Sequence, residues 1–201
     1  MKLYYKPGAC SLAPHIVANE AGIKLDLVPV DLATKRTADG QDYLQVNPNG
    51  FVPALALDGG VVLTEVSVLV QYLADQSPDS GLIPEAGSMA RYRVLEALSF
   101  TATELHKNLG IFFRPDTLDA VKTSARALLT RRIGYVEAQL SKQAFIAGEA
   151  FTVADAYLWT VLNWTAFAGF DLSPFPHVQA WQAKVAARPA VQRTLREEGL
   201  A

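Results

Sequence analysis

The sequence predicts a small α/β domain with a mixed sheet, followed by an all-helical domain. Three observations predict this fold class. Before residue 76, stretches suited to strands and helices follow one another in the order β-α-β and then β-β-α. After residue 87, the apolar residues recur at intervals of three and four. Between these parts lies QSPDSGLIPEAG, with the proline and glycine content of a linker. We therefore expect domains at residues 1–80 and 87–201.

The α/β half carries a local signal for each element. Alternating or apolar stretches predict strands, and Asp58-Gly59-Gly60 predicts a hairpin turn between two of them. Gly22 suits the end of the first helix. The expected elements are a strand at 3–5, a helix at 11–22, a strand at 25–30, a polar link at 34–45 that is helical or irregular, strands at 54–57 and 61–64, and a helix at 65–75.

The helical half is expected to surround one buried helix. Apolar spacing predicts helices through residues 92–109, 121–140 and 178–185, the last ending before Arg188-Pro189. Thr152 and Asp155 resemble a capping box in which Asp replaces the usual Glu. The helix that they begin is apolar nearly all round in its body, residues 156–168, so we expect it at the centre of the domain.

The composition excludes several classes of protein. A formal net charge of -2 gives no electrostatic case for nucleic acid or an anionic membrane as partner. The single cysteine excludes an intrachain disulfide. The N-terminus lacks a signal-peptide pattern, and the apolar run at 154–170 is too short for a comfortable membrane span. We therefore expect a cytoplasmic protein with neither nucleic acid nor membrane as partner.

The sequence also lacks several site motifs. The three histidines, at positions 15, 106 and 177, have no metal-ligand spacing, and we expect no metal. There is no phosphate loop, nucleophile elbow or dinucleotide fingerprint. His15 is predicted to lie on a helix surface and is assigned no role.

The one cysteine stands at an unusual position. Cys10 lies in KPGACSLAPH, on a Pro-Gly turn where a predicted strand gives way to a helix. Unpaired amides and the dipole at a helix N-terminus stabilise a thiolate, so Cys10 is a candidate for a reactive thiol. The alternative is a small buried hydrophobe, because free cysteine is often fully buried.

Three further residues of the α/β half are candidates for ligand binding. Val52 precedes a proline that opens a strand; a cis bond there would free the Val52 amide and carbonyl for a peptide-like ligand, and a trans bond is the alternative. Glu65 begins a helix, where it either complements the dipole or binds an amino group while backbone amides hold a carboxylate. Lys35 is either a partner for a second carboxylate or a solvated lysine.

In the helical half, Ser99, Thr103 and His106 are spaced four and three apart, which places them along one stripe of a helix. Lys107 follows directly. Polar residues beside an apolar stripe are usually the solvated face, and that alternative stays open.

The order of these segments resembles one family over essentially the whole chain. The segments YYKPGACSLAPH, VNPNGFVPAL, LTE, QYLAD, TELHK, FTVADAYL and RPAVQRTLREEGL are similar in sequence and spacing to the bacterial beta-class glutathione S-transferases. The resemblance implies a thioredoxin-like N-terminal domain, an all-helical C-terminal domain, and a homodimer with its site near the subunit interface. It also implies glutathione as co-substrate, with no permanently bound cofactor.

The resemblance assigns roles to residues of the first domain. Cys10 matches the cysteine that faces the glutathione sulfur and can form a mixed disulfide with it. Val52 and Pro53 match the residue before the family's cis-proline and that proline, where the backbone pairs with the cysteinyl part of glutathione. Glu65 and Val66 match the pair that holds the γ-glutamyl end.

The remaining matches lie mostly in the second domain. Lys35 matches a further glutathione contact. His106 and Lys107 match residues that border the pocket for a hydrophobic electrophile. The helical segment that the family contributes to the glutathione site is matched by Ser99, Thr103, Glu104, Leu105 and His106.

Two departures weaken the expected contacts to the γ-glutamyl end. The family's usual Glu-Ser or Glu-Gly is Glu65-Val66 here, so only the Val66 amide can bind unless Ser67 compensates. Ser99 stands where close relatives commonly carry asparagine. At about 0.5 to 1.5 kcal/mol per neutral hydrogen bond, the two losses correspond to roughly one order of magnitude in affinity.

Three functions follow as hypotheses. The first is conjugation of the glutathione thiolate to small hydrophobic electrophiles, a detoxification reaction, with donors from Cys10 and Ser11 stabilising the thiolate and His106 assisting. The second is glutathione-dependent thiol-disulfide exchange or peroxidase chemistry through Cys10. The third is a non-catalytic binding protein on the same fold.

Overall fold

The chain packs as two compact units in a computed structural model that describes residues 1–201. The sheet unit comprises Met1–Ile83 together with Arg188–Ala201, and the helical unit comprises Pro84–Ala187. The sequence predicts that the last residues belong with the helical domain. They pack with the sheet unit instead, because the final helix buries Val191 and Thr194 there.

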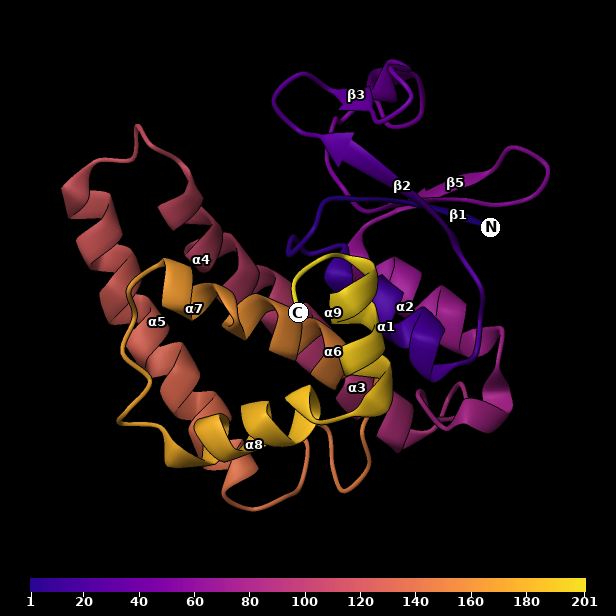
Figure 1. The fold of residues 1–201 in the computed structure, drawn as a ribbon. Coiled ribbons are helices and arrows are strands. Elements are labelled where there is room, and N and C mark those ends of the chain that lie inside the picture. The colour runs from indigo at the N-terminus through magenta and orange to yellow at the C-terminus, as the bar shows by residue number, and fades with distance from the viewer. The chain divides into compact units, whose positions relative to one another are not determined.

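Five strands form one mixed sheet in the order β3-β2-β1-β4-β5 (Figure 1). The central pair, β1 and β2, is parallel, and every other neighbouring pair is antiparallel. The predicted order β-α-β followed by β-β-α is confirmed, and the arrangement is thioredoxin-like. The strands are β1 (Lys2–Tyr5), β2 (Asp26–Asp31), β3 (Arg36–Thr37), β4 (Ala54–Ala56) and β5 (Val62–Thr64).

Three helices accompany this sheet. Helix α1 (Leu12–Glu20) packs against both α2 (Val66–Asp75) and α9 (Pro189–Glu197). Figure 1 shows all three on the same side of the strands. Because α1 has neighbours on several sides, residues 12–18 are all buried. The prediction that His15 lies on a helix surface is therefore wrong: its side chain is 3% exposed.

The link at residues 34–45 contains an element that its sequence does not reveal. Strand β3 pairs with the end of β2, and a 3-10 turn follows at Tyr43–Gln45. Tyr43 is fully buried and belongs to the small core formed with Tyr4, Val30, Val52 and Ala54. A two-residue strand is too short to show an alternating pattern, so the segment was predicted only as helical or irregular.

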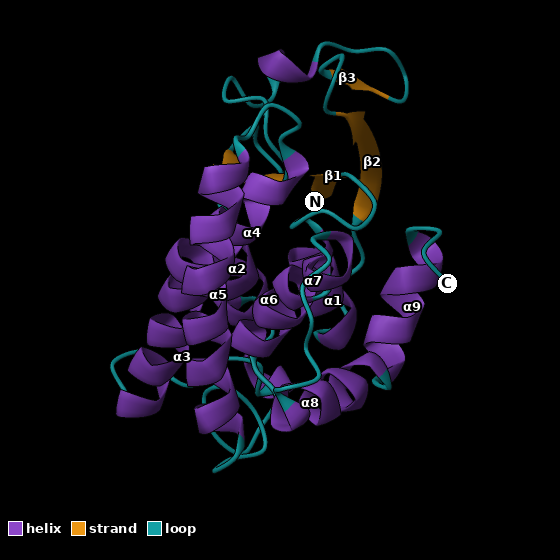
Figure 2. Ribbon diagram, turned by 90° about the vertical axis from the view of Figure 1, so that its left-hand side faces the viewer, coloured by secondary structure: helices purple, strands orange, loops and turns teal.

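All the remaining long helices belong to the helical unit, Pro84–Ala187. Figure 2 draws the helices of the whole chain in purple. Each residue of α6 is buried, which confirms the expected central helix. The predicted helical body does not continue unbroken to residue 168, because α6 ends at an exposed Asn163 and a short α7 follows. The elements are α3 (Met89–Phe100), a π-helical turn (Thr101–His106), α4 (Lys107–Gly110), a 3-10 turn (Ile111–Phe113), α5 (Asp119–Leu140), α6 (Val153–Leu162), α7 (Trp164–Phe167) and α8 (Pro176–Ala186).

The start of α6 is fixed by the buried carboxylate of Asp155. It accepts hydrogen bonds from the Thr152 amide at 3.0 Å and the Thr152 hydroxyl at 3.1 Å, as the predicted capping box requires of the acidic residue. It also accepts from the Ile146 amide at 2.9 Å and from Trp181 Nε1 at 3.1 Å. Asp155 therefore joins α6 to α8 and to the loop before α6.

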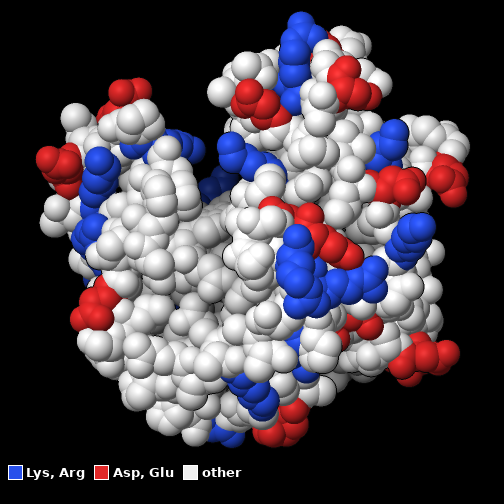
Figure 3. Space-filling view, viewed as in Figure 1, with Lys and Arg blue, Asp and Glu red and all other residues white.

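The surface and the helix lengths carry two further findings. On the face that Figure 3 presents, acidic and basic side chains lie together in mixed groups. Wide areas without Lys, Arg, Asp or Glu separate these groups. None of the helices is both long and apolar enough to span a membrane.

Candidate functional site

The connection from β1 to α1 places Cys10 after a tight turn. The Ala9 amide donates to the Lys6 carbonyl at 3.0 Å, so Pro7 and Gly8 occupy the two central positions. Gly8 has a φ of 72°, as the second central residue of a type II turn requires. Ser11 precedes α1, and its buried hydroxyl accepts from the Lys6 amide at 3.1 Å and donates to the Lys6 carbonyl at 3.2 Å. The hydroxyl of Ser11 therefore holds the turn, and only its backbone amide faces the cysteine.

Cys10 is held as a neutral thiol. Its Sγ lies 3.2 Å from the Val52 carbonyl oxygen, to which it donates. Burial raises the pKa of the Cys10 thiol to about 12, and the charge of Glu65 acts in the same direction. The amides of Cys10 and Ser11 lower this pKa, but burial outweighs them. In this structure, therefore, the amides at the helix start do not suffice to make Cys10 a thiolate at pH 7.

The loop before β4 presents the backbone of Val52 beside Cys10. The Val52-Pro53 peptide bond is cis. The preceding residue is fixed by two donors to the Phe51 carbonyl, the Tyr43 hydroxyl at 2.7 Å and Asn47 Nδ2 at 2.8 Å. The Val52 amide makes no hydrogen bond within the chain, so this loop offers one backbone donor next to the thiol.

The start of α2 offers two more backbone donors. Glu65 precedes the helix with a φ of 69°, a conformation that costs energy for any residue except glycine and that often marks functional sites. Its carbonyl accepts from the Val68 and Leu69 amides, both at 3.0 Å. The amides of Val66 and Ser67 make no hydrogen bond within the chain, so they can hold an anion at the helix start. The Val66 side chain is buried and contributes no polar group.

Lys35 is tied to the same loop as Val52. Its Nζ donates to the Gly50 carbonyl at 2.8 Å and lies 5.5 Å from the centre of the Phe51 ring. Lys35 also has a positive φ, of 56°. Because a lysine ammonium has three donors, this one can bind an anion while keeping its contact to Gly50.

In the helical unit, the predicted stripe of Ser99, Thr103 and His106 is altered by the π-helical turn at Thr101–His106. Ser99 and Thr103 are exposed neighbours, and the Thr103 hydroxyl donates to the Ser99 carbonyl at 3.0 Å. His106 turns instead toward α6, where its Nδ1 lies 2.6 Å from the Tyr157 hydroxyl. The spacing of an α-helix does not apply across a π turn, and such turns are frequent at functional sites.

The other predicted residues of this segment differ in their surroundings. The Glu104 carboxylate accepts from Arg132 Nε of α5 at 2.6 Å. Leu105 is fully buried, so its side chain presents no surface to a ligand. Lys107 is exposed.

His106 belongs to an aromatic cluster that its sequence position does not reveal. Burial, and to a lesser extent the charge of Lys107, lowers the pKa of His106 to about 4, so the ring is neutral at pH 7. Its ring centre lies 4.8 Å from that of Trp164, with the rings nearly perpendicular. Phe113 lies edge-on to Trp164 at 5.4 Å and stacks on Phe167 at 4.5 Å. These aromatic residues come from three segments, and only their apolar character in the sequence could have suggested them.

Comparisons with known proteins match both units. The glutathione S-transferase N-terminal domain matches residues 8–76, and the C-terminal domain of the same family matches residues 100–189. Glutathione S-transferase GstA of Escherichia coli O157:H7 is 48% identical, and the alignment covers 100% of both chains.

Solved structures match over the full length as well. A sphingomonad glutathione S-transferase complexed with glutathione is 46% identical, with a TM-score of 0.96 and full coverage of both chains. The bacterial beta-class glutathione S-transferase of Sphingomonas chungbukensis is 44% identical, with a TM-score of 0.96 and full coverage of both chains. The chain therefore belongs to the bacterial beta class of the glutathione S-transferases, and it is an enzyme whose co-substrate is glutathione.

Proposed function

We propose that this enzyme binds glutathione on the loops of the sheet unit. It then joins glutathione through its sulfur to aromatic or other hydrophobic electrophiles. The observation that carries the proposal is the hydrogen bond from Cys10 Sγ to the Val52 carbonyl, 3.2 Å long. This contact sets the thiol beside a backbone donor suited to a peptide, the Val52 amide. A peptide bound there would have its own cysteine next to Cys10.

The groups of the sheet unit suit the ends of glutathione. The Val66 and Ser67 amides suit the γ-glutamyl carboxylate, and the Glu65 carboxylate suits its amino group. Lys35 suits the glycyl carboxylate. Since Val66 supplies no hydroxyl, the Ser67 amide is the second donor to the γ-glutamyl end.

In this proposal the neutral Cys10 turns its single S–H away from the Val52 carbonyl and donates it to the sulfur of the bound glutathione. The Cys10 S–H and the amides of Cys10 and Ser11 would favour the charged form of the glutathione thiol and lower its pKa. The glutathione thiolate then attacks an electrophilic carbon. A carbon–sulfur bond forms while the leaving group departs with the electron pair of its own bond.

The aromatic cluster around His106 supports an electrophile with a flat, apolar body. Phe113 is 45% exposed and Phe167 is 67% exposed, and their parallel rings present a stacking surface. We assign the electrophile to this surface together with His106 and Lys107. By resemblance to the family, we also assign Ser99, Thr103 and Glu104 to glutathione binding.

The test is steady-state conjugation of a chlorinated nitrobenzene with glutathione, with calorimetric titration of glutathione in parallel. We expect saturable turnover and measurable binding. Binding without turnover toward any of a panel of electrophiles would overturn the proposed reaction, and absence of both would overturn the assigned glutathione site.

A second activity is supported by the free thiol of Cys10, a residue of intermediate exposure. Its thiolate would attack the glutathione sulfur of a mixed disulfide between glutathione and another thiol, forming a Cys10–glutathione disulfide and releasing that other thiolate; a glutathione thiolate would then release Cys10 and form glutathione disulfide. Because the pKa of Cys10 is raised, we expect this exchange to be slow at pH 7. A Cys10 that shows no added glutathione by mass spectrometry after incubation with glutathione disulfide would exclude it.

We also propose that the enzyme is a cytoplasmic homodimer. Large apolar side chains are exposed in both units, with Phe51 at 68% in the sheet unit and Met89 at 69% in the helical unit, and association would cover such surface. A sequence with a single cysteine, which has no intrachain disulfide to maintain, suits a reducing compartment. Sedimentation equilibrium that gives the mass of a single chain at micromolar concentration would exclude the dimer.

A further inference from the structure

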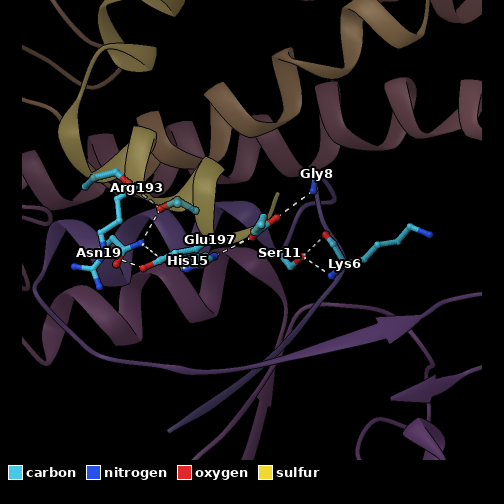
Figure 4. A network of polar contacts seen from close by, with 10 residues as sticks. Lys6, Gly8, Ser11, His15, Asn19, Arg193 and Glu197 are labelled. Atoms are coloured by element: carbon cyan, nitrogen blue, oxygen red, sulfur yellow. Dashed lines mark hydrogen bonds and ion pairs between the residues drawn. The ribbon is translucent and has the colours of Figure 1, made fainter. Parts of the chain in front are cut away.

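A buried carboxylate near the C-terminal end of the chain, that of Glu198, binds the turn that precedes Cys10. Figure 4 labels Gly8 of this turn and His15, the two residues that the carboxylate contacts. Glu198 follows α9, and its side chain is fully buried. One oxygen, Oε2, accepts from the Gly8 amide at 3.1 Å. The other oxygen, Oε1, lies 2.9 Å from His15 Nδ1 on α1.

His15 of α1 contacts this carboxylate at the oxygen that does not bind the turn. Its second ring nitrogen, Nε2, lies 2.9 Å from Glu197 Oε2. Both ring nitrogens of His15 therefore lie within hydrogen-bonding distance of a carboxylate oxygen. Glu197 is itself bound by Asn19 at 2.9 Å and by Arg193 at 2.8 Å. The whole arrangement is therefore satisfied and leaves Glu198 little freedom.

The contact to Gly8 links this arrangement to the proposed glutathione site. Gly8 is a central residue of the turn at 6–9, and Cys10 is two residues further along. Ser11 fixes the turn at Lys6 from the α1 side, and Glu198 fixes it at Gly8 from the α9 side. A side chain of Leu200 also lies beside the turn, 3.9 Å from where a Cβ on Gly8 would be.

The attachment of α9 to α1 does not require a buried acid at position 198. Arg188 binds Glu20 at 2.6 and 2.9 Å, and Asn19 binds Thr194 at 2.9 Å. Burying a carboxylate carries a large desolvation cost, and apolar replacements of buried ion pairs are often as stable or more so. Two acids, Glu197 and Glu198, contact His15. Of these two, only Glu198 also binds the turn before Cys10.

We propose that Glu198, held by His15, is a positioning residue that fixes the turn before Cys10 and thereby the thiol and amides facing the glutathione sulfur. The inference rests on the proposed function for its effect on catalysis. Its effect on Cys10 itself is independent of that function.

The experiment compares three substitutions in the full chain. Glu198→Ala removes both contacts, Glu198→Gln keeps an oxygen that can accept from the Gly8 amide, and Glu197→Ala removes the other acid at His15 without touching the turn. For each variant we measure the melting temperature, the rate of Cys10 alkylation by iodoacetamide without glutathione, and KM and kcat for glutathione.

We expect Glu198→Ala to change the Cys10 alkylation rate and kcat/KM for glutathione by about tenfold or more, the equivalent of one charged hydrogen bond. Glu198→Gln should restore most of both values. Glu197→Ala should lower the melting temperature, because His15, Asn19 and Arg193 lose the carboxylate that they contact. The Cys10 alkylation rate and kcat/KM should stay within about twofold of the unmodified enzyme, because the contact between Glu198 and the turn is kept.

Two results would overturn the proposal: an unchanged Cys10 alkylation rate in Glu198→Ala, or equal changes in Glu198→Ala and Glu197→Ala. If Glu198→Ala does not fold, Glu198→Leu fills the volume without an acceptor and replaces it in the same comparison. Absence of turnover in the unmodified enzyme would count against the proposed function only, because alkylation of Cys10 needs no glutathione.

Discussion

Burial changes the chemistry of Cys10 and His106 in opposite directions. It keeps the proton on the thiol and removes it from the imidazole, because in each case the neutral form is favoured away from water. Both groups are therefore uncharged at pH 7. The thiol is suited to donate to the glutathione sulfur, and the imidazole to pack among aromatic rings.

Replacing Cys10 with alanine separates its two possible uses. We expect Cys10→Ala to abolish the mixed disulfide with glutathione and to retain much of the conjugating activity, because the attacking sulfur belongs to the substrate. The loss of one donor should cost up to about tenfold in kcat/KM. Mass spectrometry after incubation with glutathione disulfide and conjugation kinetics measure the two effects. Loss of all conjugation in a folded variant would show that Cys10 is indispensable to the chemistry.

The depressed pKa of His106 predicts a dependence of stability on pH. The pKa is about 4 in the folded chain against an ordinary 6.5, so below pH 6.5 the unfolded chain binds more protons at this site. The contribution of His106 is therefore fully present above pH 6.5 and is lost as the pH falls toward 4. We expect the free energy of unfolding to fall less between pH 7 and 5 in His106→Gln than in the unmodified chain. Urea titrations at the two pH values measure it, and equal falls would contradict the prediction.

At the scale of the element, Asp155 determines where the central helix begins. Its carboxylate accepts from four donors on three segments. We expect Asp155→Ala to lower the free energy of unfolding by about 2 to 4 kcal/mol, since buried donors are left without an acceptor. The KM for glutathione should stay nearly unchanged.

Asp171 supplies a matched control for that substitution. It caps a turn at Ser173 in the same unit but is exposed, so Asp171→Ala should cost no more than about 0.5 kcal/mol. Thermal unfolding and glutathione kinetics on both variants make the comparison. A stable Asp155→Ala enzyme with a raised KM would mean that the helix start serves binding rather than stability.

The elements differed in how far their sequences could predict them. The hairpin around Gly59 and Gly60 and the buried helix α6 follow from local patterns, since turn chemistry and an all-round apolar surface are visible in one stretch of chain. Strand β3 and the π turn at Thr101–His106 are set by neighbours in space, so no local period marks them. Helix α9 has a visible start at Arg188-Pro189, but its place in the sheet unit depends on long-range contacts with α1.

The candidate site shows the same division. The positions of Cys10, Val52 and Glu65 on loops could be read from turn and helix-start signals. The raised pKa of Cys10 could not, because it depends on how closely other segments cover the thiol. His15 could have been placed correctly, since the stretch 12–18 is apolar on every side of the helix and leaves no surface for it to occupy.

At the scale of the whole molecule, the sheet unit is built from both ends of the chain. Residues 188–201 contribute buried Val191, Thr194 and Glu198 to it. We expect deletion of these residues to destabilise the sheet unit selectively, because α1 would lose its cover and His15 its acidic partners. Hydrogen exchange should show faster exchange in β1 and β2, with α6 amides serving as the control. Unchanged protection of β1 in the shortened chain would contradict this.

The same arrangement has a consequence for synthesis on the ribosome. Chains usually fold domain by domain from the N-terminus as they emerge. Here the first residues translated lack α9 until residues 189–197 have been made, whereas Pro84–Ala187 is complete before then. The helical unit can therefore finish folding first, and the Cys10 turn reaches its final form only once α9 has emerged. A nascent chain stalled before residue 188 would combine an immature Cys10 turn with a folded helical unit.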